Sequence, residues 1–501
     1  MKGVVAASHH LASEAGAEML REGGNAIDAA IVANAVLCVV YPHMTSIGGD
    51  LFALVWPAGA AEPIGLQGAG RSGEGASIEA MRERGFSAMP LRGATTVTVP
   101  GTVQAWGRLI ERYGTVGLGR ALAPAAAIAR DGFVVGENLS RQLHADHAWL
   151  SQDPEAARVL PPLLAGMKLR QPELATTLEQ IGRSGFGGFY FGEMGRAIAA
   201  AVERRGGFLT AADMASHRGE WIAPLALRYR DLTIYEMPPP TQGLVALAML
   251  ARLERDPSSS LRAGPSLARR LAGLREVTYG LRSRYLSDPD FTPVPAEPFL
   301  DADAVGAGPL ETLPDGDTVY LCAADAEGNL VSLIQSIAFD FGSGVIAEGT
   351  GILLQNRGCY FSLDPGHVNR LEPRKRTMHT LIPALAARAG RPYAAFGTMA
   401  GEGQPQIQVQ VALNLFDAGL EPAEAVSAPR VRVNPAGDVL WVEADYPGAA
   451  ELNRGASPTV ELLPPRDQRL GHAQALIVDG ADSWRAGADP RADGSVEFSS
   501  A

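Results

Sequence analysis

Apolar residues recur with helical spacing near the start of the chain. Leu11, Ala15 and Met19 fall on one helical face, and Gly23-Gly24-Asn25 then interrupts the pattern. The helical spacing resumes over residues 27–37, where almost every small position is alanine. We therefore expect two successive helices, the second of which packs closely on a sheet.

Short apolar runs of strand type appear elsewhere. LFALVW follows Gly48-Gly49-Asp50, and ATTVTVPG ends at Pro100-Gly101. Residues 102–280 are predicted to be mainly helical. Residues 318–356 alternate strand-like segments (VYLCAAD, NLVSLIQS, GILLQN) with glycine turns. The pattern thus changes from helix-rich to strand-rich just before Thr318.

The segment directly before Thr318 differs in composition from the parts on either side. Residues 301–317 (DADAVGAGPLETLPDGD) are acidic and weakly apolar, and they contain proline and glycine. Such a composition is typical of an exposed linker.

Bulk properties exclude several classes of protein. The 501 residues exceed an average single domain, and 46% hydrophobic with 20% charged residues is ordinary for a soluble globular chain. The net charge of −12 leaves no basic excess to neutralise phosphates, which argues against nucleic acid or an anionic membrane as partner. Cys38, Cys322 and Cys359 have neither metal nor redox spacing, so we expect reduced, mostly buried thiols.

Signals for targeting, metals and nucleotides are not found. The first residues have one lysine and no apolar run long enough for a signal peptide, and no 18-residue apolar segment occurs. The expectation is a cytoplasmic protein, unless a leader has been removed. His144-Ala145-Asp146-His147 has no third ligand nearby, so no metal is expected. Neither a GxxxxGK loop nor a dinucleotide fingerprint in the right context is present.

The pair Asp317-Thr318 begins the strand-rich part. Taken alone, a threonine at the start of a strand is an ordinary β-branched residue. A threonine freed at an N-terminus is different, because its hydroxyl is a nucleophile and its own α-amine, with a pKa near roughly 8, can act as the base. Composition and periodicity do not select Thr318 for this role.

A resemblance does select it. The stretch GDTVYLCAADAEGNLVSLIQSIAFDFGSGVIAEGTGILLQNRGCYF resembles the start of the small subunit in the γ-glutamyltransferase family. These are N-terminal nucleophile (Ntn) hydrolases made as one chain that cuts itself before a threonine. Further segments along nearly the whole chain are similar to the family in the same order: AASHHLASEAGAEMLREGGNAIDAAIVANAVLCVVYPHMTSIGG, VPGTVQAWGRLIERYG, GGFLTAADMASHRGEW, EMPPPTQG, KRTMHTLIPALA, FGTMAGEGQPQ and GADPRADGS.

The resemblance implies a set of catalytic residues. Thr318 matches the nucleophile, and Asp317 supplies the carbonyl that Thr318 attacks during self-cleavage. Ser336 falls where the family has a threonine hydroxyl near the nucleophile; without the resemblance it is equally a strand serine bonded to backbone. Ala400-Gly401 matches the glycine pair of the loop whose backbone N–H groups form the oxyanion hole.

The implied substrate residues depart from the family. Arg71 is the match for the arginine that binds the substrate carboxylate, although a solvated surface arginine is the alternative. The asparagine and aspartate that hold the substrate ammonium fall on Ala338 and Tyr360, which cannot pair with an ammonium as a carboxylate would. A paired serine motif that contacts the carboxylate falls on His379-Thr380.

The altered pattern resembles one branch of the family, that of oxamate amidohydrolase and its relatives. Its substrate carries an amide and a carboxylate but no amine, so the loss of the ammonium-binding acid fits. Arg357, Tyr360, His379 and Thr380 would then line the place of a substrate carboxylate. The alternative is that Arg357 is a structural ion-pair residue and His379 a neutral core histidine.

The resemblance also implies the fold and the assembly. We expect an α+β protein with the Ntn-hydrolase four-layer α-β-β-α sandwich, in which chains 1–317 and 318–501 share one structural domain and remain together as a heterodimer, with further dimerisation left open. No cofactor is required. The leading function is hydrolysis or transfer of γ-glutamyl amides such as glutathione; an oxamate-like small amide is the alternative, and an uncleaved, inactive small-anion-binding protein is the alternative from another class.

Overall fold

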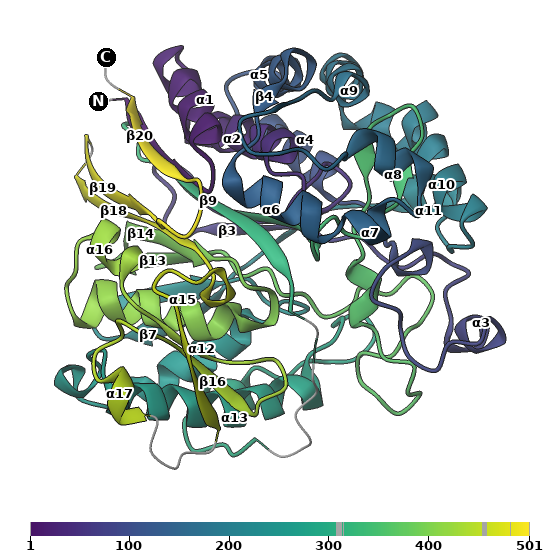
Figure 1. The fold of residues 1–501 in the computed structure, drawn as a ribbon. Helices are drawn as coiled ribbons and strands as arrows, with labels where there is room; N and C mark the ends of the chain where they lie inside the picture. Colours follow the sequence, from purple (N-terminus) through teal and green to yellow (C-terminus); the bar gives the residue numbers. More distant parts are fainter. Residues whose placement is uncertain (1, 307–312, 314, 453–457, 481, 500–501) are drawn as a thin grey trace.

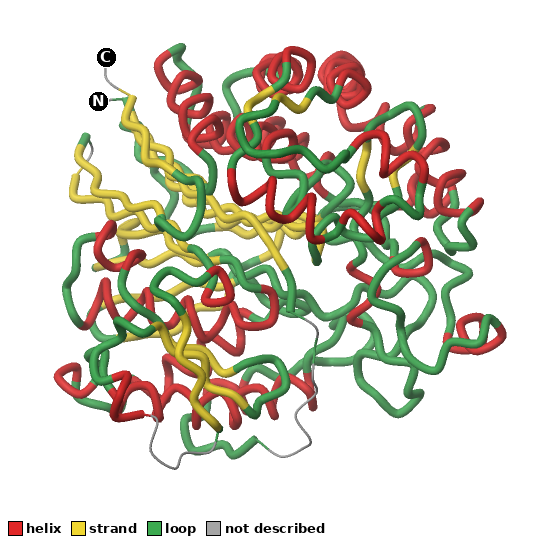
Figure 2. Tube along the Cα trace, in the orientation of Figure 1, coloured by secondary structure: helices red, strands yellow, loops and turns green. Residues whose placement is uncertain are grey.

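Four layers make up the molecule, as the computed structural model shows. Two antiparallel sheets lie face to face, one group of helices covers the outer face of the first sheet, and a second group covers the outer face of the second (Figure 1; Figure 2). The predicted α-β-β-α sandwich is therefore confirmed. The structure describes residues 2–306, 313, 315–452, 458–480 and 482–499.

The first sheet has seven strands. Their order is β20-β1-β9-β10-β2-β3-β6, and every neighbouring pair is antiparallel. The strands are β20 (Ser495–Ser499), β1 (Gly3–Ala7), β9 (Asp317–Asp325), β10 (Leu330–Ala338), β2 (Asp50–Trp56), β3 (Ile64–Gly68) and β6 (Glu220–Ile222). Since β1 pairs with β20, the two ends of the chain lie side by side (Figure 1).

The second sheet has six strands. Their order is β19-β18-β14-β13-β8-β7, and all pairings are again antiparallel. The strands are β19 (Ser483–Ala488), β18 (Ala473–Gly480), β14 (Arg391–Thr398), β13 (Ala384–Arg388), β8 (Leu232–Glu236) and β7 (Leu225–Tyr229). Both sheets combine strands from before and after Thr318.

The helices fall into two groups. Over the first sheet lie α1 (His10–Arg21), α2 (Ala26–Val40), α4 (Thr102–Tyr113), α5 (Leu118–Asp131), α9 (Pro172–Phe191) and α10 (Glu193–Arg204). Over the second lie α12 (Gly243–Leu253), α13 (Pro265–Tyr285), α15 (Gln404–Ala412) and α16 (Pro422–Ser427). The two helices predicted near the N-terminus are α1 and α2; Asn25 caps α2 by accepting from Ile27 and Asp28 amides.

Shorter elements complete the chain. The helices are α3 (Ile78–Glu83), α6 (Glu137–Ala145), α7 (His147–Leu150), α8 (Pro154–Val159), α11 (Ala211–Ser216), α14 (Glu297–Leu300) and α17 (Ala449–Leu452). The strands are β4 (Phe133–Val134), β5 (Lys168–Leu169), β11 (Ile346–Ala347), β12 (Ile352–Leu353), β15 (Val431–Val433), β16 (Val439–Glu443) and β17 (Thr459–Leu463).

Three apolar cores separate the layers. The core between the sheets includes Phe52, Tyr320 and Leu476. The second core joins α2 to the outer face of the first sheet, and the third joins α12, α13 and α15 to the second sheet. All fifteen residues of α2 are buried, as expected for an alanine-rich helix pressed between a sheet and other helices.

Two local predictions were wrong. The run ATTVTVPG is not a strand: residues 94–96 form a 3₁₀ turn, and Val99 bonds only through its amide to Arg71 O and through its carbonyl to the Gln355 side chain. The hydrogen-bond partners of this segment are therefore a loop carbonyl and a side chain, and not a neighbouring strand. The end of the predicted exposed linker is also buried, with Leu313 4% exposed and Gly316 enclosed; the rest of that prediction at 307–312 and 314 lies outside the described residues.

Other predictions hold in part. The helix-rich middle is confirmed, although β6, β7 and β8 fall within it, and GILLQN forms strand only at Ile352–Leu353. The three cysteines are free and buried, as predicted. Across the part of the chain that the structure describes, each helix is too short or too polar to cross a bilayer.

Candidate active site

Three strand ends meet at one end of the sandwich. Thr318 is the second residue of β9, Ser336 lies two residues before the end of β10, and β14 ends at Thr398, directly before the loop at 399–401. Because β9 and β10 are antiparallel neighbours, the start of one lies beside the end of the other. The topology therefore brings residues far apart in sequence to a common place.

The peptide bond between Asp317 and Thr318 lies at the centre of this place. The Thr318 hydroxyl donates to the Asp317 carbonyl oxygen at 2.6 Å, and the Ser336 hydroxyl donates to the same oxygen, also at 2.6 Å. Thr318 and Ser336 are both fully buried. The structure thus brings the predicted nucleophile, the predicted scissile carbonyl and the predicted helper hydroxyl into direct contact.

An irregularity in β10 positions Ser336. The β9–β10 register shifts between Gln335 and Ala338, where the backbone of Ala338 takes φ = 81°. The freed amide of Ala338 donates to Ser336 Oγ at 2.7 Å, so the hydroxyl accepts one hydrogen bond and gives its own proton to Asp317. The bulge therefore fixes the direction of the Ser336 hydroxyl.

A glutamine that the sequence analysis did not single out completes the surroundings of Thr318. Gln404 Nε2 donates to Thr318 Oγ1 at 3.3 Å, and Gln404 is fully buried at the start of α15. It belongs to the segment FGTMAGEGQPQ used for the resemblance, so its position directly after the predicted oxyanion loop was the available signal. A donor at this point leaves the Thr318 proton directed at Asp317.

The predicted oxyanion loop has unusual backbone geometry. Ala400 takes φ = 132° and Gly401 takes φ = 47°, conformations that L side chains rarely adopt. Neither the Ala400 nor the Gly401 amide donates to another described residue, although both residues are buried. A Cβ on Gly401 would overlap the backbone of Gly316. Two N–H groups that have no acceptor among the described residues therefore lie next to the segment that leads to the predicted scissile bond.

Arg357 is a buried cation without a carboxylate partner among the described residues. Its Nη1 donates to Thr380 Oγ1 at 3.0 Å, while its Nε and Nη2 have no described partner at 1% exposure. Its guanidinium lies 5.3 Å from the ring of Tyr360, whose buried hydroxyl is also without a described partner. The ion pair of the structural alternative for Arg357 is thus not seen, and two N–H groups remain for an anion.

His379 makes a different kind of contact. Its Nε2 lies 3.1 Å from Asp50 Oδ2, and its Nδ1 accepts from the Leu381 amide at 3.4 Å, which leaves the Nε2 proton for Asp50. Burial, followed by the charge of Arg357, lowers the pKa of His379 well below its usual value. Burial raises the pKa of Asp50 to about 7, against the lowering effect of Arg357. His379 is therefore neutral, and its role toward a substrate remains a prediction.

Arg71 already has carboxylate partners. Its guanidinium donates to Asp288 at 3.0 Å, to Asp290, and to the Arg374 carbonyl at 3.0 Å. No contact within the described residues joins Arg71 to Thr318. Its predicted role in holding a substrate carboxylate would require these ion pairs to rearrange, and it too remains a prediction.

Acidic groups surround the predicted cleavage point. Asp317 and Asp340 interact through their side chains, and burial raises the pKa of both carboxyls, so one proton is readily shared between them. Two residues before Asp317, the Asp315 carboxylate receives a hydrogen bond from Arg432 Nη2 at 2.7 Å. Sequence reasoning missed both Asp340 and Arg432: Asp340 lies within the stretch used for the resemblance but was not singled out, and Arg432 lies in none of the quoted segments.

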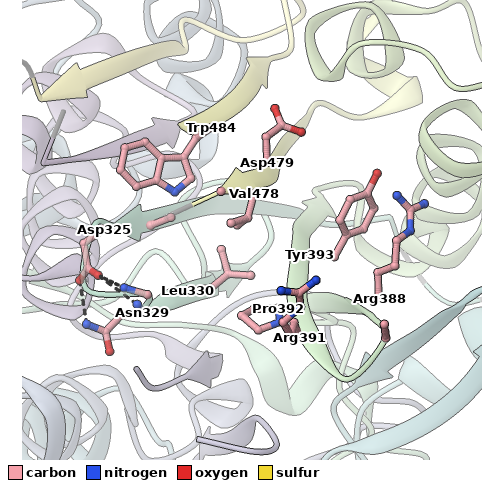
Figure 3. Close-up of a pocket in the computed structure, with 14 residues that line it drawn as sticks. Asp325, Asn329, Leu330, Arg388, Arg391, Pro392, Tyr393, Val478, Asp479 and Trp484 are labelled. Atoms are coloured by element: carbon pink, nitrogen blue, oxygen red, sulfur yellow. Dashed lines mark hydrogen bonds between the residues drawn. The ribbon is translucent and has the colours of Figure 1, made fainter. Parts of the chain in front are cut away.

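Another pocket lies at the opposite end of the sheets. It has a volume of about 610 Å³ and lies between the β9–β10 turn and the β13–β14 and β18–β19 hairpins, where Leu330, Tyr393 and Trp484 line it (Figure 3). Asp325, on the wall of this pocket, lies seven positions after Thr318 along β9, which corresponds to about 23 Å. The described residues contain no group of three side chains that could hold a metal ion. His144 and His147, the two histidines considered in the sequence, lie on separate helices, α6 and α7.

Comparisons with known proteins identify the family of the chain. The family model for gamma-glutamyltranspeptidase matches residues 12–499. The chain is 38% identical to the glutathione hydrolase-like YwrD proenzyme of Bacillus subtilis, over 99% of this chain and 98% of the relative. It is 34% identical to the oxamate amidohydrolase proenzyme of Klebsiella pneumoniae, with the same coverage.

A solved structure gives the same result for the fold. The crystal structure of cephalosporin acylase from Bacillus halodurans matches with a TM-score of 0.92 and 35% identity, over 99% of this chain and 96% of that one. The family-model match at residues 12–499 includes every residue of the candidate site. The chain therefore belongs to the gamma-glutamyltranspeptidase family of Ntn hydrolases.

Proposed function

We propose that this protein cuts itself between Asp317 and Thr318 and then uses the freed Thr318 to hydrolyse a small amide that carries a carboxylate. The observation that carries the proposal is the Asp317 carbonyl, which accepts hydrogen bonds from both Thr318 and Ser336. The names of relatives support it, because the Bacillus subtilis and Klebsiella pneumoniae proteins are both called proenzymes.

In the cleavage step, Thr318 Oγ forms a bond to the Asp317 carbonyl carbon. The carbonyl oxygen takes up the negative charge while the Ser336 hydroxyl donates to it. The bond from that carbon to the Thr318 nitrogen then breaks, the nitrogen gains the proton given up by the hydroxyl, and an ester remains. Water hydrolyses the ester, which leaves a carboxylate on Asp317 and a free α-amine on Thr318. Residues 1–317 and 318–501 stay together because both sheets use strands from each.

In turnover, the α-amine of Thr318 accepts the hydroxyl proton as the oxygen attacks the substrate amide. The N–H groups of Ala400 and Gly401, which have no acceptor in the described part of the chain, are suited to hold the oxyanion. The amine or ammonia leaves with the proton, and water resolves the acyl-threonine ester. An amino acid in place of water would give transfer instead of hydrolysis, with ping-pong kinetics.

The substrate class follows from the charges near the site. Ala338 and Tyr360 offer no carboxylate for a substrate ammonium, whereas the buried Nε and Nη2 of Arg357 have no partner in the part of the chain that the structure describes. A carboxylate would satisfy these groups, since guanidinium and carboxylate form two parallel hydrogen bonds. A small amide with a carboxylate and no required amine, of the oxamate type, is therefore favoured over a γ-glutamyl amide, although relatives named glutathione hydrolase keep the latter as the second candidate.

Intact mass under denaturing conditions tests the cleavage. Wild type should give two chains, the second beginning at Thr318, while Thr318→Ala should give one chain of 52.6 kDa. A single chain in both after long incubation would refute the proposal and favour an uncleaved small-anion-binding protein.

Ammonia release from oxamate, compared with hydrolysis of a γ-glutamyl anilide, separates the two substrate classes. Arg357→Gln should raise KM for the carboxylate-bearing amide by about 10- to 100-fold with a smaller change in kcat, because hydrogen bonds to a charged group are worth about 1.5–3 kcal/mol. Arg388→Gln, at an exposed position of the far pocket, is the matched control and should leave both constants unchanged. Equal KM values for Arg357→Gln and wild type would contradict this assignment.

A further inference from the structure

The segment before Thr318 packs against several other parts of the fold. Leu313 inserts its side chain into an apolar cluster with Phe339, Tyr360 and Met378, and is 4% exposed. Gly316 has the Ala338 carbonyl and the Tyr360 hydroxyl on one side and Gly401 on the other, with no room for a Cβ. The chain therefore passes between the predicted oxyanion loop and the wall that contains Tyr360.

Asp315 anchors this segment to a buried arginine. Arg432 in β15 is 1% exposed, and its Nη2 donates to Asp315 at 2.7 Å and lies 3.3 Å from Glu402. Its Nη1 donates to the Arg469 carbonyl, and its Nε has no partner among the described residues. Burial alone would lower the pKa of Arg432, but the carboxylates of Asp315 and Glu402 raise it above its usual value. The arginine is therefore charged.

The charges of this cluster balance only while Asp315 is in place. Arg282 and Arg432 face Glu402 and Asp315, and Glu402 bonds to both arginines, at 3.3 Å each. Three of these four residues, all but Asp315, are at most 2% exposed and belong to the body of the fold. If the segment with Asp315 withdraws, two guanidinium groups share one carboxylate inside the protein, which is unfavourable unless another anion takes its place.

We propose that Arg432 is a carboxylate subsite of the mature enzyme, which Asp315 fills before cleavage. This inference rests on the proposed cleavage at Thr318. It specifies a substrate class: amides whose acyl part carries a carboxylate about two residues away from the scissile carbonyl, as in an acidic peptide.

The direction and length of the acyl group follow from the chain itself. Asp315 is on the N-terminal side of the Asp317 carbonyl, which is the acyl side of the bond that Thr318 attacks. Two residues of extended chain span up to about 7 Å, so Arg432 is beyond the reach of the carboxylate of oxamate, which is attached directly to its amide carbonyl. Arg357 and Arg432 therefore select acyl groups of different length, and the second subsite accepts the longer ones.

The test uses the cleaved protein and two peptides. The protein carries Asp315→Asn, so that its own tail does not compete for Arg432. The probes are Leu-Pro-Asp-Gly-Asp, which copies residues 313–317, and Leu-Pro-Asn-Gly-Asp, and binding is measured by calorimetry. The first should bind at least about tenfold more tightly, as expected for a hydrogen bond between charged groups. The C-terminal amides of both peptides, tested for ammonia release, should show the same preference in KM.

Two substitutions test whether Arg432 causes the difference in binding between the two peptides. Arg432→Gln should remove the discrimination between the two peptides, whereas Arg469→Gln should keep it, because Arg469 touches Arg432 only through its backbone and its guanidinium pairs with Asp467 and Glu461. Should Arg432→Gln fail to fold, the comparison of peptides on the protein with Arg432 intact still decides. Equal binding of the two peptides by the cleaved protein would overturn the subsite and leave the proposed function standing. A single uncut chain by mass would refute the cleavage, and the subsite with it.

Discussion

The Ser336→Ala substitution should slow self-cleavage far more than it weakens the fold. Two side-chain hydroxyls donate to the Asp317 carbonyl, those of Thr318 and Ser336. When Thr318 Oγ attacks, it becomes the nucleophile, so Ser336 remains as the side-chain donor to the developing oxyanion. Removal of one oxyanion donor typically lowers a rate by roughly 10²–10³-fold, and we expect a decrease of this size.

The fold should tolerate the change with a moderate loss. Without the Ser336 hydroxyl, the buried Ala338 amide loses the acceptor that it now has at 2.7 Å. An unsatisfied buried donor costs about 1–3 kcal/mol, which lowers stability without preventing folding. Ser336→Thr keeps a hydroxyl and should retain most of the cleavage rate.

The assay follows the fraction of cut chain over time by intact mass, starting from freshly synthesised protein. Ser332→Ala is the matched control, because Ser332 is buried in the same strand but bonds to the Tyr320 hydroxyl at 2.8 Å and not to Asp317. It should cleave at the wild-type rate. If Ser336→Ala is folded by circular dichroism and cleaves within about threefold of wild type, the hydroxyl does not stabilise the oxyanion and the reasoning fails.

Three further predictions concern single positions. Ala400→Gly should raise the free energy of unfolding by about 1 kcal/mol in urea denaturation. Glycine removes the backbone strain of a side chain at φ = 132°, and this gain exceeds the added conformational entropy of the unfolded chain. A loss of stability would show that the Ala400 backbone is not strained. Gly316→Ala should slow cleavage, since its Cβ would lie 2.5 Å from the Ala338 oxygen, whereas Gly328→Ala, in a turn at the far end of β9 with open space around it, should leave the cleavage rate unchanged; equal rates for both would contradict this. Asp50→Asn, in the uncleaved Thr318→Ala background, should flatten the pH dependence of stability between pH 4 and 7. The folded-state pKa of Asp50 is raised to about 7, from an unfolded value near 3.9. Protonation of Asp50 therefore stabilises the fold by up to about 4 kcal/mol below about pH 4, and this contribution is lost as the pH rises through 7. If Asp50→Asn leaves the slope of stability against pH unchanged, as measured by urea titrations at several pH values, the prediction is refuted.

Much of the fold was predictable because its signals are local or belong to the family resemblance. The helices at 10–21 and 26–40 follow from apolar spacing and from the Gly-Gly-Asn interruption between them. The run at 94–101 misled because β-branched residues indicate an extended backbone but not a partner strand; here the partners are the Arg71 carbonyl and the Gln355 side chain, which only the tertiary structure supplies.

The candidate site, like the fold, was predictable only in part. Thr318, Ser336 and the loop at 400–401 were placed by resemblance, and the contact of Thr318 and Ser336 with Asp317 agrees with that placement. Gln404, Asp340 and Arg432 were not found, because their importance depends on which side chain each one meets across the fold. A charged residue in a strand, such as Arg432, is ordinary in sequence, and its burial against Asp315 becomes visible only in three dimensions.

The arrangement of charges also bears on why cleavage would open the site. Before cleavage, Asp317 is an internal residue whose side chain shares its surroundings with Asp315 and Asp340. Cleavage adds a new carboxylate at the end of this segment, among carboxyl groups whose pKa values burial has already raised. Repulsion between like charges in a region of low dielectric then favours withdrawal of the tail, against the single ion pair between Asp315 and Arg432. The same event that frees the α-amine of Thr318 would thus remove Gly316 from its place beside Tyr360 and Gly401. It would also expose the charged Arg432 to a substrate, in place of the Asp315 that had neutralised it.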